Sequence, residues 1–130
     1  MNLYKVVVKV DGKYVSAMTR HIGEHVVTYR VGKWSKPHLK GSKLFCFKSL
    51  RVARQFIEDM KFHDLDPDNS FVFKCEGKNL VVGGQFSGWL SERAIRYFWT
   101  KEGSPVEMIN GSSKQTVFAD EIKITKKVWP

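Results

Sequence analysis

The N-terminal residues alternate between apolar runs and turn residues in the way that is typical of antiparallel strands. Residues 3–10 form one apolar run and residues 13–18 form a second, with Asp11-Gly12 between them. Asp-Gly favours a type I′ turn, in which both central residues have positive φ and which joins the strands of a tight hairpin. The pattern therefore predicts a β-hairpin in which Val8 lies opposite Val15.

A third strand is predicted over residues 26–31, where apolar and polar residues alternate. We expect Arg30 to face outward on this strand and Val31 to be its last inward residue. Residues 32–41 are polar and basic and include Trp34, which predicts a connection between strands.

A helix is predicted directly after a short apolar strand at residues 43–48. Ser49 suits the N-cap because its hydroxyl oxygen accepts a hydrogen bond from a free amide of the first turn. The apolar residues that follow at helical spacing are Leu50, Ala53, Ile57 and Met60. This spacing predicts a helix with one face in the core.

The second half of the chain predicts further strands and one more helix. Residues 71–76 and 79–82 are predicted to pair with each other, and a helix is predicted from residue 89 or 90 to residue 100. Further strands are predicted near residues 106–109, 116–118 and 122–128. Sequential strands with two short helices predict a single α+β domain over residues 1–130, built on an antiparallel sheet.

Composition narrows the class of protein. The chain has 130 residues, of which 42% are hydrophobic, with nine Phe and four Trp, and this is typical of a folded domain. No apolar run approaches the ~20 residues that cross a bilayer, so we expect no membrane-spanning segment. Cys46 and Cys75 form at most one disulfide, and the apolar neighbours of Cys46 predict a buried, reduced thiol and hence a cytoplasmic protein.

The positive charge is concentrated in the first half of the chain. Residues 1–61 contain 13 Lys and Arg against 4 Asp and Glu, whereas residues 62–130 contain 9 of each. The whole formal net charge of +9 therefore comes from the first half. Such a field attracts nucleic acid, nucleotides or an acidic protein surface, although a basic surface also serves solubility alone.

Patterns for metal or covalent chemistry are incomplete. Residues 64–69 place carboxylates at alternate positions, as a calcium loop does, but Pro67 stiffens the loop and Cys75 stands where the twelfth-position Glu belongs. His21 and His25 precede a strand and share no helical face, and no Cys-x-x-Cys occurs. We therefore predict a protein that is not an enzyme and that uses no metal or cofactor.

A predicted anion site lies in the second half of the chain. The glycine-rich residues 83–88 link a strand to the predicted second helix, and free amides at a helix N-terminus bind anions. Guanidinium groups fork onto phosphates, and exposed indoles stack on bases. The predicted ligand-binding residues are Gly83, Gly84, Trp89, Arg93, Arg96 and Trp99. The alternative is that the Trp side chains are core and the Arg side chains are merely solvated.

Arg30 and Trp34 are predicted to belong to a second ligand-binding set, in the basic half. Lys33 and Lys36 add positive charge around them. A large indole in a polar loop usually serves binding. A contact between copies of the chain in a homo-oligomer is the competing interpretation of Trp34.

Three blocks of the sequence resemble a group of small phage and prophage proteins, mostly of unknown role. The blocks are Tyr4-Lys5-Val6-Val7 with residues 11–17, residues 43–50 with Ala53 and Phe56, and residues 116–123. The resemblance extends to the anti-Thoeris sponge proteins, which capture a cyclic ADP-ribose signal made by a host TIR-domain defence. It assigns no residue, because no ligand-contact motif aligns with this chain.

This resemblance implies a phage-encoded, non-enzymatic anti-defence protein that binds a phosphate-bearing nucleotide in the host cell cytoplasm, as a homo-oligomer. The middle block is also similar to ADP-ribosyltransferases, but the His-Gly-Thr opening and the catalytic Glu motif are missing. Three rival functions remain open: binding of nucleic acid, inhibition of an acidic host protein, and modification of a nucleotide by an enzyme.

Overall fold

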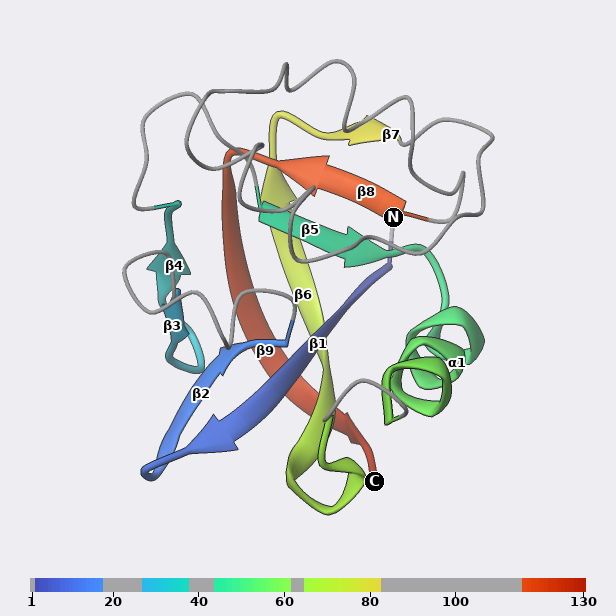
Figure 1. Ribbon diagram of the computed structural model, residues 1–130. Coiled ribbons are helices and arrows are strands. Elements are labelled where there is room, and N and C mark those ends of the chain that lie inside the picture. Colours follow the sequence, from blue (N-terminus) through green and yellow to red (C-terminus); the bar gives the residue numbers. More distant parts are fainter. Residues whose placement is uncertain (1, 18–26, 38–43, 62–64, 83–115) are drawn as a thin grey trace, which may run out of the picture.

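The backbone forms an antiparallel sheet with a helix packed on it (Figure 1). The computed structural model describes residues 2–17, 27–37, 44–61, 65–82 and 116–130. The strands are β1 (Leu3–Val10), β2 (Lys13–Ser16), β3 (Thr28–Tyr29), β4 (Trp34–Ser35), β5 (Leu44–Phe47), β6 (Ser70–Lys78), β7 (Val81–Val82), β8 (Thr116–Ala119) and β9 (Glu121–Trp129). The α+β prediction is confirmed. The second predicted helix, over residues 89–100, lies outside the described residues.

The β1–β2 hairpin has the predicted turn and register. Asp11 has φ 51° and Gly12 has φ 78°, as a type I′ turn requires. Val8 pairs with Val15. The hairpin therefore carries Lys13 and the start of β2 to one end of the molecule, where they border the candidate site.

Strand β1 lies in the middle of the sheet. It pairs with β6 along one edge, and along the other edge it pairs first with β5 and then with β2. Strand β2 pairs with β3, and β4 pairs with β9, which returns beside β6. Gly32 N in the β3–β4 turn donates to Ile124 O over 2.8 Å. Strands β1, β2, β3, β4, β9 and β6 therefore surround a common interior (Figure 1).

Helix α1 (Leu50–Met60) covers the sheet where β1, β5 and β6 meet. Val52 N donates to the Ser49 hydroxyl over 3.2 Å, which confirms the predicted cap. Ala53, Ile57 and Met60 are buried, as their spacing predicts. Burial of a side chain such as Ile57 contributes about 1.5–3 kcal/mol, so this face fixes the helix on the sheet.

The third predicted strand is shorter than expected. Val31 was expected to face inward, but its side chain is 53% exposed. The chain turns there, because Lys33 N donates to Arg30 O and Gly32 has φ 79°. The predicted connection at residues 32–41 also contains strand β4, whose two residues are too few to produce an alternating pattern.

The predicted pairing of residues 71–76 with residues 79–82 is wrong. Strand β6 continues to Lys78, and its two edges are occupied by β1 and β9. Asn79 has φ 54°, and after it β7 turns away to pair with β8. The sequence pattern predicts strands but contains no information on which neighbour occupies an edge.

Candidate functional site

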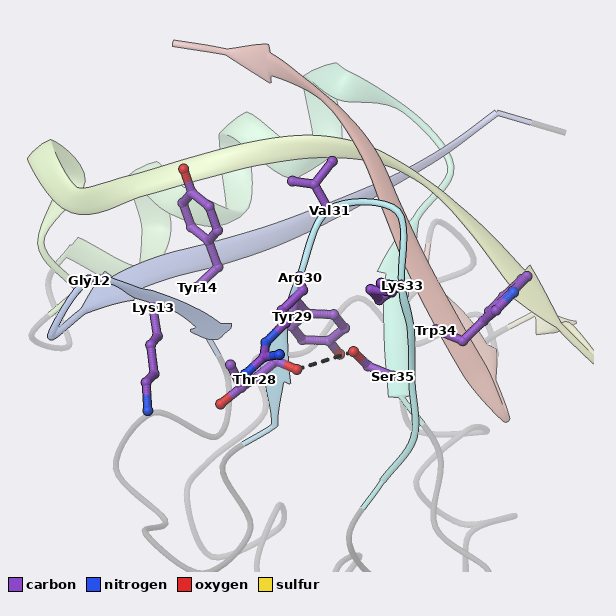
Figure 2. A pocket seen from close by; sticks show the side chains of 10 residues that line it. All are labelled: Gly12, Lys13, Tyr14, Thr28, Tyr29, Arg30, Val31, Lys33, Trp34 and Ser35. Carbon is purple, nitrogen blue, oxygen red and sulfur yellow. Dashed lines mark hydrogen bonds between the residues drawn. The ribbon is translucent and has the colours of Figure 1, made fainter.

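An open pocket of about 690 Å³ lies between the β1–β2 hairpin and the β3–β4 turn. We call it the hairpin pocket, and it is formed by residues 12–14, 28–31 and 33–35. Ser35 Oγ donates to Thr28 O over 3.1 Å and ties β4 to β3 behind it (Figure 2). The walls are thus held by backbone turns and strand pairing.

Three cations line the hairpin pocket. Figure 2 shows Arg30 in the middle, with Lys13 on one flank and Lys33 on the other. All three residues are exposed. Within the described part of the chain, no carboxylate lies within ion-pair distance of any of them. Their charge is therefore available to an anion.

Trp34 shares the pocket with Arg30, but its ring is turned away from it (Figure 2). Lys78 Nζ lies 4.3 Å and Lys123 Nζ 5.1 Å from the centroid of the Trp34 ring. These ammonium groups pair with Glu121 and Glu76, respectively. The indole is thus fixed at the rim by cation–π contacts, which stabilise such pairs by about 0.5–1 kcal/mol at exposed sites.

Tyr14 supplies an aromatic wall that the sequence did not single out. Its ring meets Phe71 and Phe73 edge-on, with centroids 5.8 Å and 5.1 Å apart. Tyr14 also pairs with Tyr29 across β2 and β3. The sequence offers one signal for this residue: Tyr14 lies in the second predicted strand, two residues after the predicted Asp11-Gly12 turn.

Lys5 is a buried cation in the interior behind the pocket. It is 1% exposed, and its Nζ donates to Phe45 O over 2.6 Å and to Ser16 Oγ over 3.3 Å. The ammonium also lies 4.3 Å from the centroid of the Phe45 ring and 5.3 Å from that of Tyr29. Burial lowers the pKa of Lys5 to about 8. This cation is committed to the protein's own groups.

The two thiols lie beside Lys5. Cys46 and Cys75 are both free and buried, as predicted for Cys46. Cys46 Sγ donates to Val117 O over 3.7 Å. The hydrogen bond that Cys75 donates to Cys46, together with burial, raises the pKa of the Cys75 thiol well above its ordinary value. We interpret both as neutral thiols in the core, out of reach of a ligand in the pocket.

The Tyr29 hydroxyl is buried without a hydrogen-bond partner among the described residues. Burial raises the pKa of Tyr29 well above its ordinary value. An unpaired buried hydroxyl costs about 1–3 kcal/mol. Its ring separates the interior from the hairpin pocket, which it lines.

The predicted anion site of the second half lies outside the described residues. This applies to Gly83, Gly84, Trp89, Arg93, Arg96 and Trp99, which stay predictions. Of the predicted binding residues, the structure describes Arg30 and Trp34 and brings both to one pocket.

The calcium-like acidic loop, residues 64–69, is described from Leu65 onward, and there it has a local structural role. The Asp66 carboxylate accepts hydrogen bonds from Asp68 N over 2.9 Å and from Asn69 Nδ2 over 2.8 Å, which caps the 3-10 turn η3 (Pro67–Asn69). Among the residues that the structure describes, no group of three or more His, Cys, Asp and Glu is placed to hold a metal ion.

Comparison with protein-family models, with curated proteins and with solved structures finds no match to this chain. No helix in the described ranges has the length and apolar character that crossing a membrane requires.

Proposed function

We propose that the protein binds a small phosphate-bearing ligand, such as a nucleotide, in the hairpin pocket, and that it does so without catalysis. The observation that carries this proposal is that Lys13, Arg30 and Lys33 line one pocket without a carboxylate partner in the described chain. Three cations match the charge of a diphosphate, and a guanidinium forks onto two phosphate oxygens.

The shape of the pocket supports a ligand of nucleotide size. Its volume of about 690 Å³ falls within the range of ~300–1,000 Å³ that small-molecule sites occupy. Tyr14 also lines the pocket and adds aromatic surface to it, on the side of the β2–β3 pair that carries Tyr29. The Tyr14 ring is held in place by Phe71 and Phe73, so little ordering is needed on binding.

The chemistry of the lining favours binding over hydrolysis. The described lining contains no His, Cys, Asp or Glu, so it offers neither the usual general base nor a thiol nucleophile. The cations stabilise a bound anion instead.

The resemblance to phage anti-defence proteins supports a more specific role. In that role the protein sequesters a cyclic ADP-ribose isomer in the host cell cytoplasm, as a homo-oligomer. Tight capture of a scarce signal needs binding alone, which fits a lining without catalytic groups.

Isothermal titration calorimetry with AMP, ADP and a cyclic ADP-ribose isomer tests the proposal. We expect the diphosphates to bind more tightly than AMP, because the second phosphate engages more of the three cations. Arg30→Glu should weaken diphosphate binding by about 10²-fold, since a charged hydrogen bond is replaced by repulsion.

Lys48→Glu is the matched control. Lys48 lies directly before the Ser49 cap of α1 and outside the hairpin pocket, and the substitution changes the net charge by the same amount. The proposed site is contradicted if Arg30→Glu leaves diphosphate binding intact. It is also contradicted if Lys48→Glu weakens binding as much as Arg30→Glu does.

A further inference from the structure

A second basic surface lies on the other side of the molecule from the β3–β4 turn, where α1 meets the end of β9 (Figure 1). We call it the α1–β9 surface and define it by Arg51, Arg54, Lys74, Lys126 and Trp129. The four cationic residues are exposed, and Trp129 is half-buried.

A groove of about 390 Å³ forms the first part of this surface. Arg51, Arg54 and Trp129 line it together with Leu50. The Arg54 guanidinium carbon lies 5.4 Å from the centroid of the Trp129 ring. Glu58 also borders the groove, but its carboxylate accepts from Lys61 Nζ over 2.7 Å. Neither guanidinium group therefore has a carboxylate partner in the described chain.

Two β-bulges form the second part. The register between β6 and β9 shifts twice, between Val72 and Phe73 and between Lys74 and Cys75. As a result, three consecutive residues of β9, 125–127, are exposed where alternation would bury one of them.

The bulges leave Lys74 directly opposite Lys126. Like charges that face each other across two strands repel, so this pair is unfavourable unless an anion lies between the two ammonium groups. Within the described ranges, neither lysine has a carboxylate partner, and the neighbouring Glu76 pairs with Lys123 over 2.8 Å. Both exposed ammonium groups are therefore available to an anion.

We propose that the α1–β9 surface binds a strand of single-stranded nucleic acid. Lys74, Lys126 and Arg51 supply separate cations for successive phosphates, and the groove beside Trp129 and Arg54 supplies a flat aromatic wall for a base. Positive charge along a strand together with an aromatic stacking wall is the combination that single-stranded nucleic acid requires. An acidic protein segment matches the cations but leaves the stacking wall unused.

The experiment measures the fluorescence anisotropy of a labelled oligothymidylate of about 15 nucleotides over a series of salt concentrations. We expect Kd to rise steeply with salt, because each phosphate contact releases counterions. Arg54→Glu and Lys126→Glu should each weaken binding about tenfold and reduce the salt dependence by about one ion. Lys126→Gln, which removes the charge without reversing it, should give a smaller loss of the same kind.

Lys36→Glu is the control, because it changes the net charge equally at an exposed residue outside the α1–β9 surface. It should alter Kd by less than about twofold. Equal weakening by Lys36→Glu overturns the proposal, since net charge alone then explains binding. It is also overturned if the oligothymidylate fails to bind, or if an oligo-glutamate peptide binds with the same dependence on Arg54 and the nucleic acid does not.

Discussion

Lys5 and Arg30 carry the same charge in neighbouring parts of the molecule, yet their surroundings are opposite. Lys5 Nζ is dehydrated and donates to Phe45 O and Ser16 Oγ. Arg30 is exposed in the hairpin pocket without a carboxylate partner in the described chain. Tyr29, the residue before Arg30, lies with its ring near the Lys5 ammonium.

The difference follows from where the two residues stand. Lys5 lies in the central strand β1 with its side chain buried, whereas Arg30 follows the last residue of β3 and begins the β3–β4 turn, where its side chain is exposed. A cation whose hydrogen bonds are satisfied by the protein contributes to structure, whereas an exposed and unpaired cation is available to a ligand. Lys5 therefore has a structural role, and Arg30 is the charge for which we propose a role in binding.

Reversal of the charge at the two positions gives the largest expected effect. Lys5→Glu should destabilise the fold by about 4 kcal/mol or more, because a buried carboxylate would face Phe45 O and two aromatic rings. Arg30→Glu should change stability by no more than about 0.5 kcal/mol. Urea unfolding followed by circular dichroism measures both, and equal effects would remove the distinction.

The pH dependence of stability isolates the buried charge. Burial lowers the pKa of Lys5 from 10.5 to about 8, so between these values the unfolded chain binds a proton that the folded chain has lost. Stability from Lys5 should therefore rise with pH across this window, by about 3 kcal/mol in total. Below pH 8 both states bind the proton, so the contribution of Lys5 to stability should no longer depend on pH.

Other groups also titrate in this pH range. Their contributions cancel when the unfolding free energy of a Lys5→Met variant is subtracted from that of the wild type at each pH. The raised pKa values of Cys75 and Tyr29 act in the opposite sense, because the folded chain keeps those protons at alkaline pH. The lowered pKa of Cys46, caused first by its hydrogen bond with Cys75, acts in the same sense as Lys5. The unfolding free energy of the wild type minus that of Lys5→Met should increase from pH 8 to pH 10.5. A constant difference would show that Lys5 keeps its ordinary pKa.

Among the substitutions of buried residues, Tyr29→Phe has the smallest expected effect. The hydroxyl has no partner among the described residues, so its removal relieves an unpaired polar group in the core. We expect stability to be unchanged or to increase by up to about 1 kcal/mol. Thermal unfolding of the variant checks this, and a loss of more than about 1 kcal/mol would mean that the hydroxyl has a partner.

Local patterns in the sequence predicted much of the described fold. The Asp11-Gly12 turn, the Ser49 cap and the alternation of Ile122 and Ile124 in β9 each depend on neighbours close in the chain. The pairing of β7 with β8 depends on which strand edge is free, and that is decided by residues far away in sequence.

The candidate site was predicted only in part for the same reason. Arg30 and Trp34 stand out as an outward cation and an indole in a polar stretch. Lys13 and Tyr14 join them only because β2 pairs with β3. Lys5 reads as an ordinary polar residue of β1, and its burial follows from the strands that close around it.

The most direct test of the hairpin pocket as a phosphate site is an NMR titration with ADP that follows backbone amides and the Arg30 Nε–H group. Among the described residues, we expect the largest shifts on Arg30 and on residues 12–14, 28–31 and 33–35, with the Lys5 amide nearly unchanged. Largest shifts on the α1–β9 surface, or no shift at a saturating concentration of ADP, would contradict the assignment of the hairpin pocket as the phosphate site.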